Sequence, residues 1–228
     1  MTPKHHIVFL TGAGISQESG ISTFRDANGL WNNHKIEEVA SPKGFEKNPQ
    51  LVLDFYNARR KQLDEIEPNA AHRLIAQLET KYKVTVITQN IDDLHERAGS
   101  TNVLHLHGEL RKSRSSKNPN LIYDCNQDIK LGDLASDGNQ LRPHIVWFGE
   151  VVTEIEKALA ITQSADLFVI VGTSMVVHPA ASLLLAVPVD VQIVYIDMNP
   201  DVEEGINLLV IKEKATAGVR QLIEVYLP

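Results

Sequence analysis

The amino-acid sequence predicts an α/β fold: a doubly wound, mostly parallel, Rossmann-like sheet with a smaller lobe formed by two insertions. Short apolar runs rich in β-branched residues alternate along the chain with segments of helical periodicity. Several of these runs end directly in glycine or polar residues, as strands of a nucleotide-binding sheet do. Two stretches, about 27–68 and 109–142, break the alternation and supply the small lobe. The large lobe of this single domain then comprises about 1–26, 69–108 and 143–228.

The composition restricts the class of protein and its partners. Of the 228 residues, 43% are hydrophobic and 22% are charged, which is typical of a globular domain with an adequate core. The net charge of −7 argues against a nucleic-acid binder, although a local pocket can still hold a small anion. Cys125 is the only cysteine, which excludes an intramolecular disulfide and an all-cysteine metal site. With no signal peptide and no apolar span long enough for a membrane, we expect a cytoplasmic protein.

The first expected element is a strand over residues 5–11, followed by a glycine turn (GAGIS, 12–16) and a helix that opens near Gln17. A strand, a tight turn and a helix N-terminus can accept a phosphate through free backbone N–H groups. A β-carbon at Gly12 or Gly14 would hold the phosphate away from those donors. The turn matches the dinucleotide-binding pattern only in part, since Gln17 replaces the third glycine, and such turns are often only tight connections.

A second loop follows at residues 20–26 (GISTFRD), in which Phe24 and Arg25 could cover a bound nucleotide. The same loop also fits a surface segment anchored by its phenylalanine, with the arginine in water. Helical periodicity then predicts a helix over 48–64, where Tyr56 and Arg59 project from one face. In the simplest interpretation of that helix, the tyrosine is half-buried and the arginines form a solvated basic face.

The next helix is expected over 69–82, with Asn69 as its cap and His72 as a partly exposed structural residue. It leads to the stretch that organises the chain, Val84 to Gly108. A strand over 84–88 ends in Gln89, Asn90 and Asp92, and a second strand over 103–106 ends at His107. Because the crevice beyond the carboxyl ends of parallel strands is where ligands bind, these side chains suggest a reaction site. They equally suit a helix cap and a turn residue before glycine.

The C-terminal half continues the alternation after an irregular stretch over 110–141. A strand is expected to end at Gly149-Glu150, and buried strands over 166–171 and 191–196 end at Gly172 and Asp197. Helices are expected over 153–162, 179–187 and 218–226, with a last short strand over 207–211.

Taken together, these segments resemble the sirtuin (Sir2) family of NAD-dependent protein-lysine deacylases. The matching segments are GAGIS (12–16), GISTFRD (20–26), TQNIDDLH (88–95), RPHIVWFGE (142–150) and GTS (172–174) with Val177 and Pro179. They occur in the family's order and are spread over residues 12–179. Five motifs in register are not five independent accidents.

The resemblance implies NAD as the cofactor and assigns roles to individual residues. Asn90 and Asp92 would hold the nicotinamide end in a reactive pose, Gln89 would bind ribose, and His107 would be the general base. An imidazole suits that role because its ordinary pKa lies near working pH. The products would be nicotinamide, free lysine and O-acyl-ADP-ribose. The cofactor contacts implied are Gly12, Ala13, Gly14, Ile15, Phe24, Arg25, Gln89, Asn90, Ile91, Asp92, His107, Gly172, Thr173, Ser174, Asp197, Met198, Asn199 and Ala215.

Within the family, Ala40 with Tyr56 and Arg59 resembles the acyl-pocket signature of the bacterial class III subgroup, which removes succinyl and malonyl groups. A guanidinium pairs with a carboxylate in two-pronged fashion, and a phenol adds a hydrogen bond. A neutral acetyl group could still enter the same pocket. The acyl-lysine peptide would lie along a segment that the resemblance also identifies: Val146, Phe148, Gly149 and Val177.

The chain departs from the common sirtuin pattern in one respect. Two Cys-x-x-Cys pairs usually hold a structural zinc, and here only Cys125 is present, so we expect no metal and a shortened flap or partly disordered loop over 110–141. Three alternatives stay open: an NAD glycohydrolase, which the missing cysteines favour, an ADP-ribosyltransferase, and a catalytically silent nucleotide-binding module. The pair Tyr56 and Arg59 opposes the first, and His107 with Asn90 opposes the last.

Overall fold

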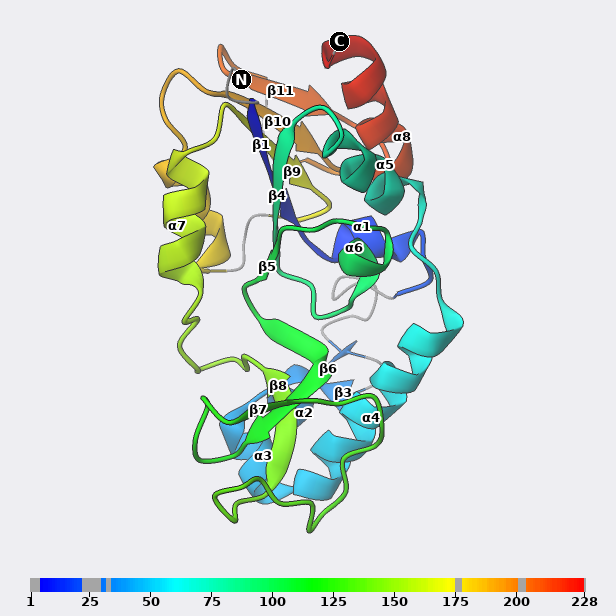
Figure 1. The fold of residues 1–228 in the computed structure, drawn as a ribbon, viewed down its shortest axis with the longest axis vertical. Helices are drawn as coiled ribbons and strands as arrows, with labels where there is room; N and C mark the ends of the chain where they lie inside the picture. The colour runs from blue at the N-terminus through cyan, green and yellow to red at the C-terminus, as the bar shows by residue number, and fades with distance from the viewer. Residues whose placement is uncertain (1–4, 22–29, 32–33, 175–177, 201–203, 228) are drawn as a thin grey trace.

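The computed structural model describes residues 5–21, 30–31, 34–174, 178–200 and 204–227. A six-stranded sheet forms the upper part of the molecule, and a second group of helices and strands lies below it (Figure 1). Every strand pair in the six-stranded sheet is parallel. Its strand order is β11 (Leu208–Ile211), β10 (Gln192–Ile196), β9 (Leu167–Val171), β1 (His6–Thr11), β4 (Lys83–Thr88) and β5 (Val103–His105).

The strand order reverses between β1 and β9, which lie side by side in register from Ile7 opposite Leu167 to Thr11 opposite Val171. Strand β1 is buried along its whole length, as its continuous apolar run predicts for a strand covered on both faces. In open α/β sheets, such a reversal leaves a crevice at the carboxyl ends of the strands. The doubly wound parallel sheet predicted from the sequence is therefore confirmed, and its switch point is located.

Helices cover both faces of this sheet (Figure 1). The helices α5 (Ala70–Leu78) and α8 (Ala215–Gln221) pack on one face through a buried apolar cluster. On the other face lie α7 (Ile155–Gln163) and the 3₁₀ helix η1 (Ala180–Ala186), which share a second buried cluster with the sheet. The short helices α1 (Ala13–Gln17) and α6 (Leu94–Arg97) directly follow strand ends, and the π-helix η2 (Leu222–Tyr226) extends α8.

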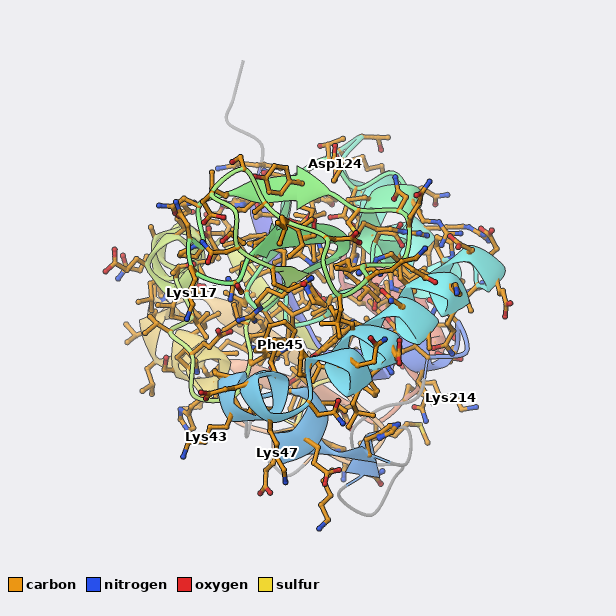
Figure 2. All side chains as sticks on the ribbon, turned by 90° about the horizontal axis from the view of Figure 1, so that it is seen from below. Lys43, Phe45, Lys47, Lys117, Asp124 and Lys214 are labelled. Carbon is orange, nitrogen blue, oxygen red and sulfur yellow. The ribbon has the colours of Figure 1, made fainter. Side chains whose placement is uncertain are left out.

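The smaller lobe combines helices with antiparallel strands (Figure 1). Its parts are α2 (Ile36–Val39), α3 (Pro42–Lys47), α4 (Pro49–Glu65), a three-stranded sheet of β7 (Ile122–Asp124), β6 (Gly108–Ser115) and β8 (Leu141–Ile145), and the pair β2 (Leu30–Trp31) and β3 (His34–Lys35). On α3, Lys43 and Lys47 point away from the molecule, whereas Phe45 points inward (Figure 2). Phe45 packs against the indole ring of Trp147, with ring centroids 5.3 Å apart.

The stretch over 110–141 is more regular than we expected. Most of its N-terminal part lies in β6, a strand that the polar sequence RKSRS concealed. Arg60 of α4 holds this region: its Nε donates to the Leu110 carbonyl at 2.9 Å, and its Nη1 donates to Asn57 Oδ1 and the Gln127 carbonyl. Arg60 is only 1% exposed, so the solvated basic face expected here is wrong for this residue. Cys125 is buried in a small apolar cluster with Ile129 and with Leu53 of α4.

Four further expectations need correction. The strand expected to end at Gly149-Glu150 stops at Ile145, because the segment after it turns back through bonds between its own residues. The helix expected over 179–187 is a 3₁₀ helix, and the closing helix begins at Ala215 rather than Gly218. His72, expected to be partly exposed, is fully buried against the His95 ring.

The N-terminus of α5 is capped by Asn69, as the sequence predicts. The Asn69 Oδ1 accepts a hydrogen bond from the Ala71 amide at 3.0 Å.

None of the helices in the described ranges combines the length and the apolar character needed to cross a membrane.

Candidate functional site

A cavity of about 1150 Å³ lies at the carboxyl ends of the parallel strands and extends to α4 of the smaller lobe. It brings together most of the residues that the sequence assigned to the site. Those lining it are Gly12, Ala13, Gly14, Gln89, Asn90, Ile91, Asp92, His107, Gly172, Thr173, Ser174, Asp197, Met198, Asn199 and Ala215, together with Ala40, Tyr56, Arg59, Val146, Phe148 and Gly149.

Three predicted residues lie outside the described ranges, and one is described but lies away from the cavity. Phe24, Arg25 and Val177 belong to the first group. Ile15 belongs to the second, because its side chain is fully buried in the apolar cluster between the sheet and α5.

The glycine turns after β1 and β9 pack directly on each other. A β-carbon on Gly14 would lie 2.6 Å from the Gly172 Cα. A β-carbon on Gly172, whose φ is +61°, would lie 2.5 Å from the Ile15 nitrogen. Side chains at these positions would force the two strand ends apart, so glycine is required here by backbone packing.

This packing corrects the reason given for the first turn from the sequence. The amides of Gly12, Gly14 and Ile15 are not free to bind a phosphate, because they donate to the carbonyls of Val171, Gly172 and Gly12 at 3.0, 2.8 and 3.1 Å. The turn therefore shapes the floor of the cavity and brings α1 against it.

Asn90 and Asp92 are fixed by a shared partner, Ser16 of α1. The Asn90 Nδ2 donates to Ser16 Oγ and to the Gly12 carbonyl, each at 3.1 Å, and the Ser16 hydroxyl donates to Asp92 Oδ2 at 3.0 Å. The Leu94 amide donates to the other Asp92 oxygen at 3.2 Å. Burial raises the pKa of Asp92 from its ordinary value, while these two hydrogen bonds oppose the rise. Asp92 accepts the first amide of α6, but the N-cap residue of that helix is Asp93, so the cap expected at Asp92 is wrong by one residue.

Gln89 links the two halves of the sheet across the switch point. Its Nε2 donates to Thr173 Oγ1 at 2.9 Å, and the Tyr195 hydroxyl donates to the Thr173 carbonyl at 2.7 Å. Both Gln89 and Thr173 line the cavity. The polar ends of β4 and β9 are therefore held together at the cavity floor.

His107 follows β5 and has one defined tautomer. Its Nδ1 lies 2.9 Å from the Gln89 carbonyl, which can only accept, so Nδ1 carries the proton and Nε2 is left as the basic nitrogen. Burial lowers the pKa of His107 below 6.5, although the bond to the carbonyl opposes this. The next residue, Gly108, has a φ of +82°, and a β-carbon on it would collide with the His144 carbonyl. Only glycine allows β6 to start immediately after the histidine.

His105 lies on β5 itself and has a structural role. Its ring nitrogens contact the Asn90 carbonyl at 2.9 Å and Glu96 Oε1 at 2.8 Å. Burial lowers the pKa of His105, but the hydrogen bond to Glu96 and the charge of Glu96 outweigh it and raise the value overall. His105 thereby fixes the loop that carries Asn90.

One end of the cavity is formed by the residues after β10 and at the start of α8. Asp197 Oδ1 accepts the Asn199 amide at 2.9 Å, which orients the carboxylate at the strand end. Ala215, the first residue of α8, is buried beside it. A carboxylate at this position can accept hydrogen bonds from a ribose diol.

The opposite end of the cavity is formed by α4 and the segment after β8. Arg59 is 8% exposed and lines the cavity beside Tyr56. Burial lowers the pKa of Arg59 to about 10, so the guanidinium stays charged at neutral pH. Burial raises the pKa of Tyr56, which therefore stays protonated. Ala40 is buried and also lines the cavity.

Two cavity residues were missed as site residues from the sequence. Ser16 was part of a quoted motif, but it lies 74 and 76 residues before Asn90 and Asp92, so the sequence gave no signal of its double bridge to them. Trp147 was assigned to a strand, yet its Nε1 donates to the Tyr56 hydroxyl at 3.0 Å. Within the described ranges, no group of three or more His, Cys, Asp or Glu side chains is arranged to hold a metal ion.

Comparisons with known proteins show the family to which this chain belongs. Residues 12–179 match the model of the Sir2 family. A curated protein of Bacteroides thetaiotaomicron named NAD-dependent protein deacylase is 52% identical over 230 residues, covering 98% of each chain. A protein of the same name from Helicobacter pylori is 59% identical over 192 residues, 84% of each chain. A crystal structure described as a Sir2 homologue–NAD complex has a TM-score of 0.85 and 39% identity, covering 97% of this chain and 89% of the other. The chain belongs to the Sir2 family.

Proposed function

We propose that this protein is an NAD-dependent protein-lysine deacylase that removes acetyl and especially the acidic acyl groups succinyl and malonyl. The observation that carries the proposal is one cavity with two chemically different parts. One part presents the imidazole of His107 with Asn90 and Asp92, and the end formed by α4 presents the guanidinium of Arg59 beside the Tyr56 hydroxyl.

The cavity suits NAD in its shape and in its polar groups. The turns at Gly12–Gly14 and Gly172–Ser174 leave a floor of backbone and small side chains, which suits an extended dinucleotide. Asp197 would accept the hydroxyls of the adenosine ribose, and its charge would disfavour a 2′-phosphate. When bound, NAD supplies a ribose carbon from which nicotinamide leaves.

The protein's own residues then perform the remaining tasks. Asn90 and Asp92, fixed through Ser16, would orient the ribose and the nicotinamide end. His107, with Nδ1 held by Gln89, would take the proton of a ribose hydroxyl at Nε2. A buried, pre-oriented base needs no rearrangement to reach its substrate.

The acyl-lysine substrate would enter past the segment after β8. The Val146 and Phe148 amides donate to the carbonyls of His107 and Ala40 at 2.9 and 3.0 Å, which fixes this segment to residues of both lobes. Phe148 is 54% exposed and lies with Gly149 at the cavity wall. A protein substrate in extended form could dock on this segment. We propose a cytoplasmic location for such an enzyme, which fits its single buried thiol, Cys125.

The test uses matched acetyl-, malonyl- and succinyl-lysine peptides with NAD, and follows nicotinamide release and peptide mass. We expect nicotinamide release to require a peptide, and kcat/KM to be higher for the acidic acyl groups. Arg59→Met should lower the succinyl-to-acetyl ratio of kcat/KM by about 100-fold, because a charge-assisted pair is lost. Lys61→Met, on the same helix with its side chain 67% exposed, should leave this ratio unchanged.

Three outcomes would contradict the proposal in different ways. Nicotinamide release that is independent of any peptide would indicate an NAD glycohydrolase. Transfer of ADP-ribose mass to the peptide would indicate a transferase. Equal rates on succinyl and acetyl peptides, or no effect of Arg59→Met, would leave a deacylase but remove the acidic preference.

A further inference from the structure

His105, the last residue of β5, bridges two hydrogen-bond acceptors, one after β4 and one on α6. Its Nδ1 lies 2.9 Å from the Asn90 carbonyl, its Nε2 lies 2.8 Å from Glu96 Oε1, and its side chain is only 8% exposed. A carbonyl and an ionised carboxylate can only accept, so each ring nitrogen must carry a proton. His107, by contrast, is held by the Gln89 carbonyl at Nδ1 and needs only that one proton.

The acidic neighbours of His105 favour the positively charged ring. Burial lowers the pKa of His105, but the hydrogen bond to Glu96, the charge of Glu96 and the charge of Glu109 on β6 raise it overall. Burial also raises the pKa of Glu96, yet the hydrogen bond from His105 outweighs this and keeps Glu96 ionised. Lys112 of β6 is paired with Glu109 at 2.8 Å. The extra proton of the pair therefore resides on the imidazole.

Two further titratable groups face the same ring. The charge on His105 opposes the rise that burial causes in the pKa of Asp92, after β4. His95 of α6 is fully buried, and burial holds its pKa well below 6.5, so it adds no competing positive charge. The imidazolium is thus surrounded by carboxylates and by one neutral imidazole.

The carbonyl that His105 holds belongs to the peptide between Asn90 and Ile91. Because a peptide is planar, fixing this carbonyl fixes the plane from which both residues enter the cavity. The Asn90 amide is fixed separately, since it donates to Thr88 Oγ1 at 3.0 Å. A neutral His105 would present a lone pair either to the carbonyl or to the Glu96 carboxylate, and one of the two bonds would be lost. The orientation of Asn90 therefore depends on the protonation of His105.

We propose that His105 is a positioning residue that works as a buried imidazolium: paired with Glu96, it holds the Asn90–Ile91 peptide for nicotinamide release and frees it on losing its proton. The contact is complete below pH 6.5 and is lost as pH rises through the higher pKa of the folded protein. Alkaline pH then slows the reaction through His105, whereas acidic pH slows it through His107. This inference rests on the proposed role of Asn90 at the nicotinamide end.

The test is the pH dependence of kcat for nicotinamide release, measured with NAD and an acetyl-lysine peptide from pH 5.5 to pH 9. Glu96→Gln keeps an acceptor oxygen but removes the charge that holds the proton on His105. The alkaline decline in kcat should begin at lower pH than in the wild type, with a rate about fivefold lower at pH 8 and an unchanged acidic limb. Glu65→Gln, which replaces an exposed carboxylate at the end of α4, should leave both limbs unchanged.

A second variant, His105→Asn, separates the titration from the contact. Its amide nitrogen can still donate to the Asn90 carbonyl in place of Nδ1, but it does not titrate. The alkaline decline should therefore be absent from this variant.

A merely structural role would lower kcat of both variants by the same factor at every pH. That result, an alkaline limb retained in His105→Asn, or a wild-type rate that stays constant up to pH 9 would overturn the inference. A wild-type rate in Asn90→Ala would instead contradict the proposed role of that residue. Absence of peptide-dependent nicotinamide release by the wild type would overturn the proposed function itself.

Discussion

The Gln89 carbonyl oxygen accepts the Nδ1 proton of His107 at 2.9 Å, and this single contact defines the chemistry of the imidazole. It leaves Nε2 as the only basic nitrogen and fixes the ring toward the cavity. Gln89 is in turn held by Thr173, so the tautomer of a residue after β5 depends on a contact across the switch point of the sheet.

The pH dependence of kcat/KM should follow the protonation of His107. Burial lowers the pKa of His107, so the neutral, basic form persists below pH 6.5. We expect kcat/KM to stay constant from neutral pH down past 6.5 and to decline only below it. Steady-state kinetics on an acetyl-lysine peptide between pH 5 and pH 8 would measure this. An acidic limb centred above 6.5 would contradict the assignment.

The double bridge through Ser16 predicts an effect on catalysis. Ser16→Ala removes the hydroxyl that donates to Asp92 and accepts from Asn90, which leaves two buried polar groups less well oriented. Nicotinamide release should slow by about tenfold to 100-fold, since an unmatched buried group costs roughly 1–3 kcal/mol. Single-turnover measurement of nicotinamide tests this. Wild-type rates in a correctly folded variant would show that the bridge is dispensable.

Adjacent cations on α4 should differ sharply in their contribution to stability. Arg60→Met removes a buried guanidinium that bonds Leu110, Asn57 and Gln127, and we expect the free energy of unfolding to fall by roughly 3 kcal/mol. Lys61→Met removes only an exposed pair with Asp128, which should change it by less than about 0.5 kcal/mol. Urea unfolding of both variants gives the comparison. Similar values would refute the role given to Arg60.

The contact between the glycine turns predicts that two matched glycine substitutions will differ in their effect on stability. Gly172→Ala places a methyl group 2.5 Å from the Ile15 nitrogen, whereas Gly138→Ala, also at positive φ, meets no atom within 4 Å. Backbone strain should lower the free energy of unfolding of both variants by about 1 kcal/mol, and only Gly172→Ala should lower it by several kcal/mol more. Thermal unfolding and NAD binding by calorimetry test this. Equal destabilisation would mean that the turns do not pack as described.

The buried pair His72 and His95 predicts acid sensitivity. Burial lowers the pKa of His72 to about 4, so the folded protein keeps this ring neutral while the unfolded chain protonates it near 6.5. Stability from this group is complete above 6.5 and is lost as pH falls toward 4, by roughly 2–3 kcal/mol. His72→Phe should flatten the decline in melting temperature over this range. A decline as steep as in the wild type would assign the sensitivity to other groups.

The sequence indicated the sheet and most of the cavity because both depend on local patterns. Continuous apolar runs gave the buried strands, and the polar residues at their ends gave Asn90, Asp92 and His107. The glycines were located correctly, but the physical reason differed, since Gly14 packs on Gly172 rather than opening amides to a phosphate. Sequence spacing could not reveal that contact, because Gly14 and Gly172 are far apart in the chain and are brought together only by the pairing of β1 with β9.

The residues that sequence patterns misplaced are those whose partners are distant in the chain. Arg60 resembles a solvated side chain until Leu110 and Gln127 are brought against it. Strand β6 carries Arg, Lys and Ser where a strand usually carries apolar residues, so its pairing with β8 was hidden. In both cases a buried polar group is satisfied by tertiary contacts that no local rule contains.

Helix α4 presents neighbouring guanidinium groups to different surroundings: Arg59 to the cavity and Arg60 to the sheet of β6, β7 and β8. A shift of α4 that reshapes the cavity also disturbs the anchor of the sheet, so changes of substrate through this helix are constrained by the scaffold. We expect substrate range to change more readily through Trp147 or Ala40, which line the cavity from outside α4, than through the backbone of α4 itself.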